Sequence, residues 1–173
     1  METTKAVAGS AYLMARTRKT GFVTCMTMAY ITELNGSVVK PEPEVVQKND
    51  YVSNRVTAEL GQGEEVIFYK YVSVLSSLNH LPGEMVSKGL NLLKDAMALG
   101  FDGLFEENVA IWNENWAHSD IIIEGDIAAQ QGIRFNIFQL NQTYTGKDER
   151  LNIGPKGFTG EKYGGSTYWD TEA

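Results

Sequence analysis

The stretch FVTCMTMAYITEL at residues 22–34 decides the fold of the N-terminal half of this chain. It is rich in β-branched and aromatic residues in rough alternation, a pattern typical of a β-strand. The pair Asn35-Gly36 follows it as a turn signal, and residues 66–77, VIFYKYVSVLSS, repeat the alternation. We therefore predict a β region over residues 1–80.

Working outward from this stretch, the segment between the two predicted strands is more polar. Residues 40–50, KPEPEVVQKND, hold two of the four prolines and several charges, so we predict a loop there. It leads into a short predicted strand within residues 51–60, and glycines and acidic residues then mark a turn before residue 66. This half should supply four or five strands, which are too few to close a β-sandwich alone.

The hydrophobic period changes after the β region. Pro82 opens a stretch whose leucines and methionines recur at helical spacing, and Gly100 can end that helix as a C′ residue. Residues 104–120 predict a second helix, and residues 121–144, which are apolar around most of the circumference, predict a buried third helix. Strands followed by helices predict an α+β chain. Because the strands are too few to close a sandwich and the apolar third helix has little to cover it, we predict that the chain is a fragment of a larger protein.

The composition is that of a soluble globular protein, with 43% hydrophobic and 21% charged residues over 173 positions. A net charge of −7 disfavours nucleic acid or anionic lipid as a partner. We see no secretory signal and no apolar run long enough for a membrane span, so the cytoplasm is the expected location. A single Cys25, expected to be an inert buried thiol, excludes an internal disulfide, and with only two histidines it excludes a zinc site of the usual spacing.

The glycine-rich stretch at residues 146–165 has no regular period and predicts a long ordered loop. It contains neither GxGxxG after a strand nor GxxxxGK[ST], so a nucleotide site of either kind is not predicted. Such a loop can shape a substrate pocket or pack on its own side chains as an Ω-like loop. Both interpretations remain open at this point.

The segment Tyr168-Trp169-Asp170-Thr171-Glu172 follows that loop and combines aromatic faces with carboxylates. These two kinds of group bind sugars: an aromatic ring stacks on the apolar face of the sugar, and a carboxylate accepts hydrogen bonds from its hydroxyls. The same residues also fit a core edge followed by a helix that is capped at Asp170 or Thr171.

Other conspicuous residues in the helical half have structural interpretations. Trp112 and Trp116 lie one helical turn apart, which is typical of core packing. Asp126 and Arg134 are ionisable residues in an apolar stretch, and each is expected to pair with a partner elsewhere. His118, among polar neighbours, is expected at the surface.

The motifs IEGDIAAQQGIRFNIFQL at residues 123–140, PKGFTGEKYGG at 155–165 and YWDTEA at 168–173 together resemble glycoside hydrolase family 65, whose members phosphorolyse or hydrolyse α-glucosides. The C-terminal stretch is similar to the family over nearly its whole length. Within the family it is most similar to the maltose phosphorylases, because kojibiose and trehalose phosphorylases tend to carry a histidine where this chain has Ser166.

The resemblance implies a domain order. Residues 1–80 would be the C-terminal part of an N-terminal β-sandwich domain, residues 81–120 a helical linker, and residues 121–173 the first helix and following loop of an (α/α)6-barrel catalytic domain. Trp169 and Asp170 match the family pair that holds the non-reducing glucose in the −1 subsite. Glu172 belongs to the same motif.

The reaction that the resemblance implies is inverting phosphorolysis of maltose to glucose and β-D-glucose 1-phosphate. Phosphate is the co-substrate, no metal or organic cofactor is expected, and the full-length protein is expected to be a homodimer. The general acid, a glutamate, and the phosphate site are expected downstream of residue 173, so the chain alone is predicted to be inactive. Alternatives are a phosphorylase of the kojibiose or trehalose type, a hydrolase of the same family, and, in another class, a non-catalytic carbohydrate-binding module.

Overall fold

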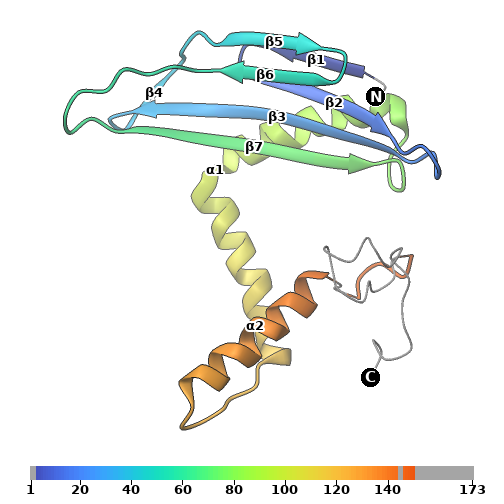
Figure 1. Ribbon diagram of the computed structural model, residues 1–173, viewed down its shortest axis with the longest axis vertical. Helices are drawn as coiled ribbons and strands as arrows, with labels where there is room; N and C mark the ends of the chain where they lie inside the picture. Colours follow the sequence, from blue (N-terminus) through green and yellow to red (C-terminus); the bar gives the residue numbers. More distant parts are fainter. Residues whose placement is uncertain (1–2, 144–145, 151–173) are drawn as a thin grey trace. The chain divides into compact units, whose positions relative to one another are not determined.

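The computed structural model describes residues 3–143 and 146–150, and it confirms the predicted α+β class (Figure 1). The chain divides into two compact units, Met1–Phe105 and Glu106–Ala173. All the strands that the structure describes lie in the first unit. The predicted domain boundaries near residues 80 and 120 stay predictions.

The first unit is built on a five-stranded antiparallel sheet. Its central strand, β3, pairs along one edge with β7 over its full length. Along the other edge β3 pairs first with β2 and then with β4, and β1 pairs with the outer edge of β2. The strands of this sheet are β1 (Thr3–Val7), β2 (Ser10–Arg16), β3 (Val23–Leu34), β4 (Ser37–Val39) and β7 (Val66–Ser76).

The loop predicted for residues 40–50 is wrong in its second half. Glu44–Lys48 forms β5, which pairs antiparallel with β6 (Tyr51–Arg55) in a hairpin whose turn has two residues. The prolines Pro41 and Pro43 misled the prediction, since both precede the strand, where a missing amide donor costs no ladder hydrogen bond. Counting this hairpin, the residues that the structure describes hold seven strands, more than the four or five predicted.

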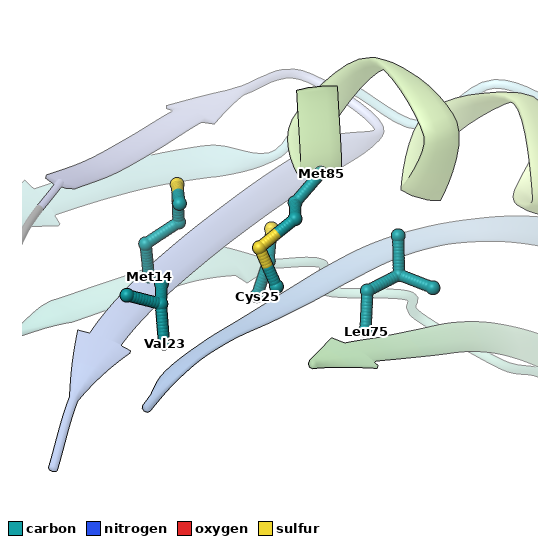
Figure 2. Close-up of a cluster of buried hydrophobic side chains, with 5 residues drawn as sticks. All are labelled: Met14, Val23, Cys25, Leu75 and Met85. Atoms are coloured by element: carbon teal, nitrogen blue, oxygen red, sulfur yellow. The ribbon is translucent and has the colours of Figure 1, made fainter. Parts of the chain in front are cut away.

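Helix α1 (Pro82–Ser119) covers one face of the five-stranded sheet with its first part. Because strand side chains alternate between faces, one set of β2, β3 and β7 residues points toward this helix. Met85 of the helix, fully buried, packs there against Cys25 and its neighbours, as Figure 2 shows. The cluster consists of Met14, Val23, Cys25, Leu75 and Met85.

One turn farther along α1, the helix approaches the sheet closely at Gly89. A Cβ added at Gly89 would lie only 2.7 Å from Thr27 Cγ2 and 3.0 Å from Ser73 Oγ. The Ser73 hydroxyl donates a hydrogen bond to the Gly89 carbonyl (3.3 Å), and it lies 2.7 Å from the Thr27 hydroxyl. The absence of a side chain at this position therefore sets how closely the helix packs on the sheet.

The two helices predicted for residues 82–100 and 104–120 are present as one helix with a break. Gly100 has φ 78° and ψ 176°, outside the helical region, so the prediction that helical geometry ends there is confirmed. A positive φ is accessible to glycine at little cost, which explains why the break falls at this residue.

Helix α2 (Ile127–Thr143) begins later than the predicted start at residue 121, because Gly125 adopts a positive φ of 85° and Asp126 caps the helix. The expectation that this helix is buried is wrong for the part of the chain that the structure describes, since none of its residues is buried. Ile127, Phe135 and Leu140 are 88%, 60% and 68% exposed. An apolar circumference predicts burial only when other elements are present to cover it.

Candidate functional site

The sugar-binding residues predicted from sequence, Trp169, Asp170 and Glu172, lie outside the described residues, as does most of the glycine-rich stretch. Their predicted roles therefore stay predictions. The structure does describe the elements that precede them in the second unit: the last part of α1, the connection at residues 120–126, α2, and the start of the glycine-rich stretch at residues 146–150.

The connection between α1 and α2 is held by side chains of α2. The Gln130 amide donates from Nε2 to the Ile121 carbonyl (2.8 Å) and accepts at Oε1 from the Ile123 amide (2.6 Å). Asp126 Oδ1 accepts from the Ala129 amide (3.0 Å), which satisfies one of the free amides at the helix start. The extended residues before α2 are thus fixed by hydrogen bonds to their backbone.

A two-pronged ion pair joins the first residue of this connection, Asp120, to Arg134 of α2. Arg134 donates from Nε to Asp120 Oδ1 (2.8 Å) and from Nη2 to Asp120 Oδ2 (2.6 Å). The hydrogen bond from Arg134 is the main reason that the pKa of Asp120 is lowered, and Asp120 in turn raises the pKa of Arg134. The prediction that Asp126 and Arg134 have structural partners is confirmed, with Asp126 as a helix cap and Arg134 as half of an ion pair.

Aromatic packing joins the helices of this unit. The ring of Trp112 lies 5.0 Å from that of Phe138 on α2 and 6.3 Å from that of Trp116, measured between centroids. Such tilted arrangements are those that aromatic rings prefer. The tryptophan pair therefore serves helix packing, as predicted, and His118 is exposed, also as predicted.

The described start of the glycine-rich stretch is locally ordered. Arg150 donates from its backbone amide (3.0 Å) and from Nε (2.8 Å) to Asp148 Oδ1, and from Nη2 to Asp148 Oδ2 (2.6 Å). These hydrogen bonds, those of the side chain first, lower the pKa of Asp148 to about 2. Asp148 is therefore ionised at neutral pH and cannot act as a proton donor there.

The first unit contains a cavity beside its central strand. A cavity of about 370 Å³ opens where β2 and β4 leave a gap along β3, beside Tyr30, Val39 and Pro41. Its lining contains no carboxylate, so it holds no acid for glycosidic chemistry. Burial raises the pKa of the Cys25 thiol, which makes it a poor nucleophile, in agreement with the predicted inert thiol.

The described residues offer neither a metal-binding cluster nor a helix suited to span a membrane. Residues 3–143 and 146–150 contain no cluster of three histidine, cysteine or acidic side chains that could hold a metal ion. Among the same residues, neither helix is both long and apolar enough to cross a membrane.

Comparison with known proteins identifies the family. The model of the glycosyl hydrolase family 65 N-terminal domain matches residues 1–115, and that of the family's central catalytic domain matches residues 134–173. The chain belongs to glycosyl hydrolase family 65. This confirms the resemblance of the C-terminal motifs to the family, and the match over residues 1–115 includes the β region.

Individual relatives of this family 65 chain include disaccharide phosphorylases. It is 49% identical to the maltose phosphorylase of Bacillus subtilis over 123 residues, which are 71% of this chain and 16% of the relative. It is 32% identical to the α,α-trehalose phosphorylase of Thermoanaerobacter brockii over 172 residues, or 97% of this chain and 21% of the relative.

A solved structure agrees with the fold of the family 65 chain. A candidate kojibiose phosphorylase from the human microbiome superposes with a TM-score of 0.73 at 29% identity, covering 98% of this chain and 22% of the other. The chain thus spans about a fifth of the length of the relatives that it matches.

Proposed function

We propose that this chain is part of a disaccharide phosphorylase whose substrate is maltose. The observation that carries the proposal is the 49% identity to a maltose phosphorylase, against 32% to a trehalose phosphorylase and 29% to the kojibiose phosphorylase of Halothermothrix orenii. Ser166, in place of the histidine that the kojibiose and trehalose enzymes tend to carry, supports the same branch.

Within this proposal the segment at residues 168–172 provides part of the −1 subsite. Trp169 stacks on the apolar face of the non-reducing glucose, and Asp170 accepts hydrogen bonds from its hydroxyls. Glu172, in the same motif, adds a further acceptor. Charge-assisted hydrogen bonds of this kind are stronger than those between neutral groups, so the carboxylates fix the orientation of the ring.

The proposed reaction inverts the configuration at the anomeric carbon. Phosphate attacks that carbon from the face opposite the glycosidic oxygen, while a carboxylic acid protonates the leaving oxygen, giving glucose and β-D-glucose 1-phosphate. Phosphate is already an anion, so no second carboxylate is needed as a base. The acid and the phosphate site belong to the part of the enzyme that follows this chain, and no metal or organic cofactor takes part. The proposed enzyme is a cytoplasmic homodimer.

The test is a phosphorolysis assay of the complete enzyme with maltose, kojibiose and trehalose in parallel. We expect glucose 1-phosphate from maltose at the highest kcat/KM, and none from the 173-residue chain alone, because the proton donor typically supplies about 10²–10⁴-fold. A preference for kojibiose or trehalose would overturn the assignment of maltose as the substrate. Turnover by the chain alone would overturn the assignment of the acid to a later segment.

Substitutions in the complete enzyme test the subsite itself. Trp169→Ala and Asp170→Asn should each lower kcat/KM for maltose strongly, whereas Trp116→Phe, which keeps an aromatic ring in the α1 packing, should leave it near the parent value. Near-normal kcat/KM in both subsite variants would show that Trp169 and Asp170 are structural. Ser166→His should lower the preference for maltose over kojibiose and trehalose.

A further inference from the structure

The tight turn between β3 and β4 holds the single Asn-Gly pair of the sequence. Leu34 pairs with Ser37 across the turn, so Asn35 and Gly36 are its two central residues, as the sequence predicted. Both have a positive φ, 50° and 76°, which is the backbone of the primed turn that suits a two-residue hairpin. Asparagine and glycine adopt this conformation most readily, and both residues are exposed here.

An Asn-Gly pair at a protein surface is chemically labile. The glycine nitrogen can attack the asparagine side chain because no β-carbon on the glycine shields it, and asparagine counts among the thermolabile residues of proteins. The bond from Gly36 N to Asn35 Cγ forms, the bond from Cγ to Nδ2 breaks, and the side-chain nitrogen leaves as ammonia with the proton of the Gly36 amide. Water then opens the succinimide ring at either carbonyl, which leaves aspartate or isoaspartate.

Hydrogen bonds fix the Asn35 side chain in the folded chain. Its Oδ1 accepts from the Glu65 amide (2.9 Å), and its Nδ2 donates to Glu64 Oε1 (3.5 Å). The Asn35 amide also donates to the Glu65 carbonyl (2.9 Å), so the turn is tied to the residues that lead into β7. To swing Cγ toward Gly36 N, the side chain must release these partners, which requires local opening of the turn.

The products fit the folded turn less well than asparagine does. Glu64 is held in place, because its Oε2 accepts from the Gly61 amide (2.7 Å). An aspartate at position 35 would put a carboxylate where the Asn35 amide now donates to Glu64, and two carboxylates at one site repel each other. Isoaspartate would also lengthen the backbone of the turn by a methylene group, against the pairing of Leu34 with Ser37.

We propose that Asn35 is a site of spontaneous deamidation, which the folded turn slows and whose products loosen the contact between that turn and Glu64. Water is the co-reactant and ammonia the by-product, so the reaction needs no enzyme or cofactor. The observations that carry the proposal are the Asn-Gly sequence, the exposure of both residues, and the hydrogen bonds that tie the Asn35 side chain to residues before β7. The inference does not depend on the proposed activity.

The test follows the mass of the peptide that carries Asn35 while the complete enzyme is incubated at mildly alkaline pH, in buffer and in urea. In urea Asn35 should deamidate faster than Asn49, which is also the first residue of a two-residue turn but precedes Asp50. In buffer the rate at Asn35 should fall at least about tenfold, because reaction then requires local opening. Gly36→Ala should slow the reaction in urea, where strain at a positive φ plays no part.

Substitutions at Glu64 and Asn35 test the protection and its loss. Glu64→Ala should raise the rate at Asn35 in buffer and leave the rate in urea unchanged. Asn35→Asp, which imitates one product, should speed amide hydrogen exchange in residues 61–66, and adding Glu64→Gln should restore part of the protection.

Each contrary result decides against a part of the proposal. A rate at Asn35 no higher than that at Asn49 in urea would overturn the site. Equal rates in buffer and in urea, or Glu64→Ala reacting no faster in buffer, would overturn the protection by the turn. Unchanged hydrogen exchange in Asn35→Asp would overturn the effect of the products.

Discussion

Replacing Gly89 by alanine tests the packing of α1 on the sheet. In a helix interior this substitution normally stabilises by about 1 kcal/mol, because alanine has the higher helix propensity. Here the added methyl would lie 2.7 Å from Thr27 Cγ2, about 1 Å closer than carbon atoms prefer. Thr27 is 1% exposed and cannot move away freely.

The expected net effect is a loss of stability. Overpacking of a core costs about 1–3 kcal/mol, and lifting the helix would also weaken the 3.3 Å hydrogen bond from Ser73 to the Gly89 carbonyl, worth about 1 kcal/mol. After subtraction of the propensity gain, Gly89→Ala should lower the free energy of unfolding by about 1–3 kcal/mol. The measurement is urea unfolding followed by far-ultraviolet circular dichroism, with the m-value unchanged.

A matched control lies on the same helix. A Cβ at Gly83, in the first turn of α1, would meet no atom within 4 Å, so Gly83→Ala should leave stability unchanged or raise it by up to about 1 kcal/mol. Thr27→Ser removes the nearest methyl and should recover part of the loss when combined with Gly89→Ala. Gly89→Ala at parental stability, or a strictly additive double variant, would refute the packing argument.

The remaining predictions concern the second unit. Gly132→Ala should stabilise α2 by about 0.5–1 kcal/mol, since the position is open and helical, whereas Gly125→Ala should destabilise it because φ is +85°; thermal unfolding of both variants distinguishes them. Arg134→Met should raise the pKa of Asp120 toward its ordinary value, measured by NMR titration, and an unmoved pKa would contradict the ion pair. Asp148, whose pKa is lowered to about 2, contributes stability that is fully present above its ordinary pKa of 3.8 and is lost as the pH falls toward 2; Asp148→Asn should abolish this acid-limb contribution in pH-dependent unfolding.

Local patterns in the sequence predicted those elements whose geometry is decided locally. Alternation identified β3 and β7, and Gly100 marked the break in α1 because glycine adopts a positive φ at little cost. Residues 44–48 were missed because the prolines before β5 outweighed Val45 and Val46. The pairing of that strand with β6 is a tertiary fact that no window of sequence contains.

In the second unit, too, the sequence predicted local features but not the tertiary contacts. The partners of Arg134 and Gln130 lie across a turn, and a sequence can indicate that an ionisable residue needs a partner without saying which one. The exposure of α2 differs from its apolar pattern because burial depends on neighbours in space. Trp169 and Asp170, in contrast, were assigned from a motif alone, and their geometry lies outside the described residues.

The pairing of β3 with β7 has a consequence for folding kinetics. It joins Thr24 to Ser76 and Leu34 to Val66, so half of the central strand's ladder closes over a long intervening chain. The β2–β3 ladder is closer in sequence and can form first, but the core around Cys25 also needs Leu75 and Met85. During synthesis the sheet therefore cannot complete its core until the first turns of α1 have left the ribosome. Until β7 has been made, the apolar strand β3 can pair along only one of its edges.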